Sequence, residues 1–175
     1  ATRLDEYYVA TIIDAIKNRR AAVMIGSGFS KNANNGHLMP NWTELAAYLE
    51  CSSTKNVTST SDILELAEMY VAVNGRSELD RILLEKTGNK ALNVTPSELY
   101  VDFLNIPWVD IFTTNYDTLL EDAAKEFRRK IEYEFKEIYD INDIAFSKSN
   151  GKTRIVKLHG SFPSHRPFII TEEEI

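Results

Sequence analysis

Three short strand-like runs in this chain, the first two of them apolar, each end abruptly in a cluster of small and polar residues. The runs cover residues 21–25, 108–112 and 154–158. Apolar runs of this length, bounded by turn-forming residues, predict buried strands. In an open α/β sheet, ligands bind beyond the carboxyl ends of the strands. The sequence therefore predicts an α/β domain with a Rossmann-like, mostly parallel sheet, whose polar clusters form a site at one edge.

The polar clusters differ in the chemistry they offer. Residues 26–30 (Gly-Ser-Gly-Phe-Ser) follow the first run, and their glycines would let the backbone approach a bound phosphate beside the next helix. The third glycine of the dinucleotide fingerprint is missing, because residue 31 is lysine. Asn115 and Asp117 follow the second run, and His159 follows the third. Each cluster is a weak signal alone, whereas their order and spacing together are more specific.

Between the first two predicted strands the pattern is helical. We expect a helical insertion at about residues 42–106, which is longer than the single crossover helix of a βαβ unit. Thr95 and the Pro-Ser-Glu that follows it form the clearest helix start. Apolar residues at helical spacing also predict an amphipathic helix over residues 4–18, with its apolar face in the core.

The last third of the chain continues the sheet. Residues 131–138 alternate apolar and polar side chains, which predicts a half-exposed strand. A further strand at 168–170 leads into a helix start at the last residues. We therefore expect residues 1–175 to form an incomplete domain whose fold continues beyond Ile175.

Composition narrows the class of protein. Of the 175 residues, 43% are hydrophobic and 26% are charged, which is typical of one globular domain. The net charge of -6 argues against a broad nucleic-acid surface, despite a basic cluster within residues 125–130. Cys51 is the only cysteine, so this chain can form neither an internal disulfide nor a cysteine-based zinc ribbon. Without a long apolar run or signal peptide, we expect a cytoplasmic protein with no membrane or nucleic-acid contact.

Taken in order, the clusters resemble motifs of the sirtuin superfamily. Residues 26–30 resemble its Gly-Ala-Gly-x-Ser phosphate loop, and residues 40–42 (Pro-Asn-Trp) stand where the deacylases carry Pro-Asp-Phe. Residues 114–117 (Thr-Asn-Tyr-Asp) resemble the Gln-Asn-Ile-Asp motif, and residues 159–162 match the catalytic His-Gly segment. The resemblance covers the chain from about residue 10 to its end.

The chain departs from the sirtuin deacylases in one respect. Those enzymes generally hold a four-cysteine zinc module, which a single cysteine cannot build. The motif variants are instead similar to the sirtuin-like domains of prokaryotic antiphage defence proteins, which hydrolyse NAD to ADP-ribose and nicotinamide. The resemblance thus implies NAD as substrate, no metal, and activity in a homo-oligomer or beside a fused or associated sensor protein.

The resemblance also implies roles for individual residues. Asn115 would orient the nicotinamide end or the attacking water, and His159 would act as general base. The residues expected to bind NAD are Gly26, Ser27, Gly28, Ser30, Asn41, Thr114, Asp117, Gly160 and Ser161. From the residues alone, Asn115, Asp117 and Ser30 could instead be helix caps, and His159 could be structural. Two other functions stay open: a NAD-dependent protein deacylase, and a NAD or ADP-ribose sensor without turnover.

Overall fold

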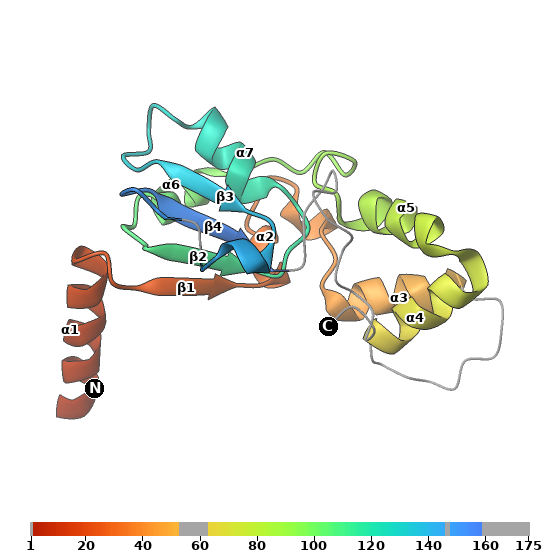
Figure 1. The fold of residues 1–175 in the computed structure, drawn as a ribbon, viewed down its shortest axis with the longest axis horizontal. Helices are drawn as coiled ribbons and strands as arrows, with labels where there is room; N and C mark the ends of the chain where they lie inside the picture. Colours follow the sequence, from red (N-terminus) through yellow and green to blue (C-terminus); the bar gives the residue numbers. More distant parts are fainter. Residues whose placement is uncertain (1, 53–62, 146–147, 159–175) are drawn as a thin grey trace.

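A computed structural model describes the chain over residues 2–52, 63–145 and 148–158 (Figure 1). In chain order its elements are α1 (Arg3–Lys17), β1 (Ala22–Ile25), α2 (Ser27–Ser30), α3 (Trp42–Ser52), α4 (Ile63–Asn74), α5 (Arg76–Thr87), α6 (Glu98–Leu104), β2 (Asp110–Thr113), α7 (Leu119–Glu126), β3 (Phe135–Ile138) and β4 (Thr153–Lys157). Short 3₁₀ turns lie at Gly36–Leu38 and Ile141–Asp143. The predicted strand at 168–170 lies outside the described residues.

The four strands form one parallel sheet in the order β1-β2-β4-β3. Ile25, Thr113 and Lys157 lie side by side at the last paired position of β1, β2 and β4. Because parallel strands end at the same edge, the loops that follow these three strands begin next to one another. The predicted α/β fold with a parallel sheet is confirmed.

The main hydrophobic core lies on one face of this sheet. Ile111 of β2 and Ile155 of β4 are fully buried there, in one cluster with Leu104 of α6 and Leu119 of α7. Burial of each such side chain contributes about 2 kcal/mol. This layer therefore holds α6 and α7 against the sheet and fixes the start of α7 beside the end of β2.

A second hydrophobic cluster joins α3, α4 and α5, which lie together to one side of the sheet in Figure 1. Leu49, Leu66 and Leu79 are among its most buried members, and Tyr116 from the loop after β2 also belongs to it. The helical region expected at 42–106 thus divides in two. Its first three helices share their own core, whereas α6 packs in the core of the sheet.

The start of α6 differs from the prediction. The helix begins at Glu98, and its N-cap is Ser97 rather than Thr95. Thr95 exchanges two backbone hydrogen bonds with Asn34 in an isolated antiparallel bridge, and a residue before proline avoids helical angles. The tertiary bridge therefore keeps Thr95 extended. Ser97 uses its hydroxyl to donate to the carbonyl of Asn32 at 2.7 Å instead of capping the helix.

The strand expected from residue 131 begins four residues later, at Phe135. Asn105 explains the delay, because its side chain donates to the carbonyl of Lys130 at 2.9 Å and accepts from the amide of Glu132 at 2.8 Å. These bonds hold the segment in a loop, away from the ladder of β4. Side-chain alternation alone could not reveal this contact with the end of α6.

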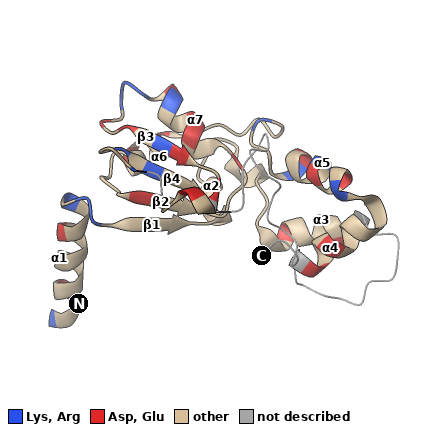
Figure 2. Ribbon diagram, in the orientation of Figure 1, with Lys and Arg blue, Asp and Glu red and all other residues tan. Residues whose placement is uncertain are grey.

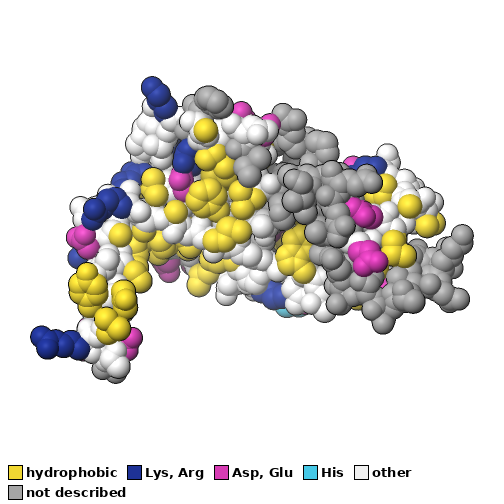
Figure 3. Space-filling model, turned by 60° about the horizontal axis from the view of Figure 1, so that its bottom comes forward, with side chains coloured by type: hydrophobic (Ala, Val, Ile, Leu, Met, Phe, Trp, Pro, Cys, Tyr) yellow, Lys and Arg dark blue, Asp and Glu magenta, His cyan; other side chains and the backbone are white. Residues whose placement is uncertain are grey.

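Helix α1 forms as predicted, closed by a capping box between Thr2 and Asp5. The expectation that its apolar face lies in the core is wrong for the described residues. Leu4 is 61% exposed and Ile12 is 57% exposed, and no residue of the helix is buried. The helix stands away from the sheet in Figure 1, and hydrophobic side chains show along it in Figure 3.

Charged side chains of both signs interleave along α5 (Figure 2), where Arg81 pairs with Glu78 and Glu85 at 3.0 Å. In the basic cluster after α7, Lys130 pairs with Glu98 at 2.9 Å. Such exposed pairs contribute little stability. Across the described ranges, no helix is long and apolar enough to cross a membrane. In the same ranges, no group of three or more His, Cys, Asp or Glu is placed to hold a metal ion.

Candidate functional site

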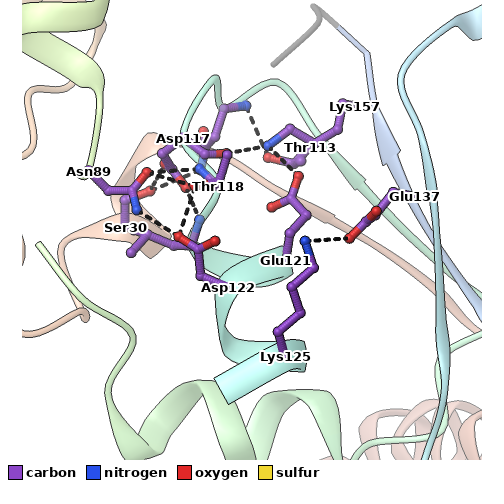
Figure 4. Close-up of polar contacts among 12 residues, drawn as sticks. Ser30, Asn89, Thr113, Asp117, Thr118, Glu121, Asp122, Lys125, Glu137 and Lys157 are labelled. Atoms are coloured by element: carbon purple, nitrogen blue, oxygen red, sulfur yellow. Dashed lines mark hydrogen bonds and ion pairs between the residues drawn. The ribbon is translucent and has the colours of Figure 1, made fainter. Parts of the chain in front are cut away.

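The loops after β1 and β2 meet through one buried serine. Ser30, the last residue of α2, is only 2% exposed. Its Oγ donates to Oδ2 of Asp117 at 2.7 Å and accepts from Nδ2 of Asn115 at 3.1 Å. A hydroxyl can donate and accept at the same time, so both bonds form together. Figure 4 shows Ser30 and Asp117 facing each other across this junction.

Asn115 is oriented by the main chain on both sides of the site. Its Nδ2 also donates to the carbonyl of Gly26 at 2.9 Å, and its backbone amide donates to Oγ1 of Thr113 at 3.0 Å. Both hydrogens of the side-chain amide are therefore used inside the protein. Its Oδ1 is left as the acceptor for a ligand or a water molecule. The Asn115 side chain does not cap α7, so its contacts do not support the interpretation that Asn115 is only a helix cap.

Asp117 combines two tasks. Its Oδ2 accepts from Ser30, while its Oδ1 accepts from the backbone amide of Leu119 at 3.0 Å. The carboxylate is 7% exposed, and a negative charge at the first turn of a helix is favourable. Asp117 therefore binds the first amide of α7, although the N-cap residue itself is Thr118. The same carboxylate also anchors the serine that holds Asn115.

The two glycines of the first loop leave space on the protein surface. A Cβ added to Gly26 or Gly28 would meet no protein atom within 4 Å, and neither residue has a positive φ. The backbone conformation alone therefore does not require glycine here. The helix that follows is a single turn, α2, whose first amides have no partner within the helix. Bare backbone with free amides suits the close approach of a phosphate.

A small cleft opens over these residues. Ser30, Asn115 and Asp117 line one wall, and residues 39–42 line the other. Trp42 at the start of α3 meets Tyr116 edge to face, with ring centroids 6.2 Å apart. A concave surface with a few polar groups among apolar walls is typical of small-molecule sites. The cleft lies between the core of the sheet and the cluster of α3 to α5.

The far wall is held in place by polar contacts at the start of α3. Oδ1 of Asn41 accepts from the amide of Glu44 at 2.8 Å, which makes Asn41 a helix cap. Lys31 donates to the carbonyl of Met39 at 2.8 Å and pairs with Glu44 at 3.2 Å. Lys31, which stands where the dinucleotide fingerprint has glycine, therefore links the loop after α2 to α3.

The structure brings most of the predicted residues to one place. Gly26, Ser30, Asn115 and Asp117 are joined by direct hydrogen bonds. Ser27, Asn41 and Thr114 line the same cleft, and Gly28 lies within α2 beside it. The three predicted residues His159, Gly160 and Ser161 lie outside the described residues.

Sequence reasoning missed a pair of charges directly behind the site. Lys157, the last residue of β4, and Glu121, in the first turn of α7, are 1% and 2% exposed. Nζ of Lys157 lies 3.1 Å from Oε1 of Glu121, close enough for an ion pair but outside hydrogen-bond geometry. Burial raises the pKa of the Glu121 carboxyl, and Lys157 partly opposes that rise. The sequence signal that could have revealed this pair is a lysine, Lys157, within the predicted buried strand 154–158.

Asn89, between α5 and α6, was also missed. It is 3% exposed, accepts from the amide and hydroxyl of Thr118 at 3.0 and 3.2 Å, and donates to Asp122 at 3.1 Å. The Asn89 side chain thus provides a hydrogen-bond acceptor for the backbone amide at the start of α7 (Figure 4). Nearby, the Tyr100 hydroxyl is buried without a hydrogen bond among the described residues, and burial raises its pKa.

Comparison with known proteins agrees with this geometry. A family model described as a SIR2-like domain matches residues 109–175. Over these residues the chain is similar to the SIR2-like family. The matched segment begins just before β2 and so includes the corner with Asn115 and Asp117, as well as the predicted His-Gly segment.

Curated relatives extend the likeness over most of the chain. The chain is 27% identical over 164 residues to the NAD(+) hydrolase ThsA of Acinetobacter baumannii (strain 532279), covering 93% of this chain and 32% of that protein. It is 26% identical to that of Enterococcus faecium (92% and 32%) and 24% identical to that of Bacillus cereus (strain MSX-D12) (89% and 31%). The chain thus spans about a third of the length of the curated relatives it matches.

Proposed function

We propose that this sirtuin-like domain hydrolyses NAD to ADP-ribose and nicotinamide. The observation that carries the proposal is the hydrogen-bonded junction of Ser30, Asn115 and Asp117 at the base of the cleft. This junction joins the two loops that carry the predicted phosphate-binding and nicotinamide-binding motifs. The names of the curated relatives, all NAD(+) hydrolases, support the same activity.

Binding of the dinucleotide would use the open backbone of the first loop. The space above Gly26 and Gly28 admits a pyrophosphate close to the free amides of α2, with Ser27 beside it. Asn41 and Thr114 line the cleft further along. The apolar surface of Trp42 offers a wall against which a flat ring can lie.

The chemistry breaks the bond between C1′ of the ribose and the nicotinamide nitrogen. A water oxygen bonds to C1′, nicotinamide leaves with the electron pair of the broken bond, and a base accepts the proton of the water. Oδ1 of Asn115, whose amide hydrogens are already bound, would accept a hydrogen bond from that water or from the nicotinamide amide. The resemblance assigns the base to His159. Asp117 would hold the junction and face the ribose.

The biological role follows from the same resemblance. We infer that the domain is the effector of an antiphage defence protein that depletes cellular NAD, in an oligomer or beside a sensor. A protein deacylase is disfavoured because the sequence has a single cysteine and lacks the zinc module. A pure sensor of NAD would use the same cleft without turnover.

The test measures nicotinamide release from NAD by the full-length protein, with chromatography as the detection method. The protein is prepared once from cells infected with phage and once from uninfected cells. We expect release without any acyl-lysine peptide, because water is the acceptor. Asn115→Ala should lower kcat about 10²-fold or more, while NAD binding by calorimetry is partly retained. Asn142→Ala, an exposed asparagine on the 3₁₀ turn before β4, is the matched control and should behave as wild type.

Three outcomes separate the candidate functions. Release that requires an acyl-lysine peptide would support the deacylase. Binding of NAD without release, even with the activator present, would support the sensor. Equal release by wild type and by Asn115→Ala would contradict the role given to this side chain.

A further inference from the structure

The buried amine of Lys157 reaches from the end of β4 to the loop that carries the site. Its Nζ donates a hydrogen bond to the backbone carbonyl of Asp117 and forms the ion pair with Glu121 (Figure 4). Its side chain also lies under the junction, next to Ser30, Asn115 and Asp117. One side chain from a third strand therefore supports the corner formed by the other two.

Stability alone does not explain this arrangement. Removing an ammonium and a carboxylate from water carries a large desolvation cost, and replacing such a pair by packed apolar side chains is often neutral or stabilising. Both Lys157 and Glu121 are almost completely buried. The neighbours of the Lys157 side chain include the apolar side chains of Ile25, Phe29 and Leu120 as well as polar groups of the junction, so an apolar side chain in its place would have apolar partners.

The bond to the carbonyl has a specific geometric effect. The peptide of Asp117 lies between Asn115 and the first residue of α7, and its side chain anchors Ser30. Holding the carbonyl of Asp117 restrains the backbone from which its side chain projects, and the bonds to Ser30 and Leu119 then set the direction of that side chain. That direction in turn sets the position of Ser30, whose hydroxyl accepts from Asn115.

We infer that Lys157 is a positioning residue, which acts through the Asp117 carbonyl to hold Asn115 in its working orientation, with Glu121 as its counter-charge. The catalytic part of this inference rests on the proposed NAD hydrolysis. Lys157 itself touches neither substrate nor reacting atoms. Displacement of a catalytic group by about 1 Å can lower a rate about 10²-fold, so loss of this support should reduce kcat more than it changes KM.

The test replaces the pair by apolar residues, Lys157→Met with Glu121→Leu, in the full-length protein. Melting temperature should stay near wild type, because both charges are removed together. The kcat for nicotinamide release should fall about 10²-fold, with KM within about twofold. Glu121→Gln, which keeps the lysine bond to the carbonyl, should retain most of kcat. The double variant Asp110→Leu with Arg154→Met removes an ion pair at the opposite end of β2 and β4 and should leave kcat unchanged.

Hydrogen exchange gives a readout that needs no turnover. The amides of Asn115 and Leu119 donate to side chains in this corner, and both should exchange about tenfold faster in the apolar double variant than in wild type. If the apolar pair fails to fold, the neutral polar pair Lys157→Gln with Glu121→Gln replaces it, with the same expectations.

The results distinguish failure of the inference from failure of the proposed function. Wild-type kcat and unchanged exchange in the double variant would overturn the positioning role. Absence of nicotinamide release from the activated wild type would overturn the proposed function, and exchange alone would then decide whether Lys157 holds the corner. A similar loss of kcat in the Asp110/Arg154 control would show that the loss comes from a general weakening of the sheet, and it would contradict the positioning role of Lys157.

Discussion

Replacing Ser30 by alanine would test the junction on which the site depends. The substitution removes one hydroxyl that is 2% exposed and serves two neighbours. The bond to the Asp117 carboxylate, 2.7 Å long, is charge-assisted and contributes about 2 kcal/mol. The bond from the Asn115 amide, 3.1 Å long, contributes about 1 kcal/mol. The expected loss of unfolding free energy is therefore about 3 kcal/mol.

A loss of this size is measurable by two methods. For a domain of this length it lowers the melting temperature by roughly 6–12 °C, and it lowers the urea midpoint without changing the slope. Ser27→Ala is the matched control, because Ser27 lies three residues earlier in the same turn and is only partly buried. We expect its effect to stay within about 0.5 kcal/mol.

The activity of the Ser30→Ala protein provides a second check. Without the serine, the Asn115 amide keeps only its bond to Gly26 and can rotate. We expect kcat for nicotinamide release to fall further than binding of NAD weakens. The reasoning is refuted if Ser30→Ala and Ser27→Ala have equal stability, because the buried hydroxyl would then contribute nothing.

Two further predictions concern the loop and the buried pair. Gly28→Ala should stabilise the fold or leave it unchanged, by up to about 1 kcal/mol, because its Cβ meets no protein atom. It should weaken NAD binding measured by calorimetry, and unchanged affinity would show that no ligand approaches this backbone. The second concerns pH. Burial and then Asp117 raise the pKa of Glu121, against the opposing effect of Lys157, so the protonated carboxyl favours the folded state. The stabilising contribution of the protonated Glu121 carboxyl is complete below the pKa of an unfolded glutamate, about 4.3. It is lost as pH rises through the pKa that Glu121 has in the folded protein. Relative to the Lys157→Met, Glu121→Leu variant, wild type should lose urea resistance as pH rises above about 4.3, and a constant difference would contradict this sign.

The strands and their order of polar clusters could be predicted because they depend on local signals. Short runs rich in apolar residues favour buried strands, and the change to glycine, asparagine or histidine marks where each run ends. Parallel pairing then brings those ends together without further information. For that reason Ser30, Asn115 and Asp117 could be placed near one another from the sequence, and the structure adds the hydrogen bonds that join them.

The features that were missed all depend on contacts between distant residues. Nothing near Lys157 in the sequence reveals that its amine meets Glu121, which lies 36 positions earlier. The start of α6 shifted because Asn34 pairs with Thr95 across 61 positions. The apolar stripe of α1 was correctly read as a helix, but periodicity reports which side is apolar and not what covers it.

The two walls of the cleft belong to bodies with separate hydrophobic cores, whose contacts include Tyr116, the bonds of Asn89 and the ion pair of Lys31 with Glu44. A small tilt of α3 to α5 would alter the width of the opening while every rung of the parallel ladder stayed intact. Entry of a dinucleotide and departure of nicotinamide would then require only the few side-chain contacts at this seam to adjust. Ligand entry and product release could therefore change the width of the cleft without changing the stability of the strands below it.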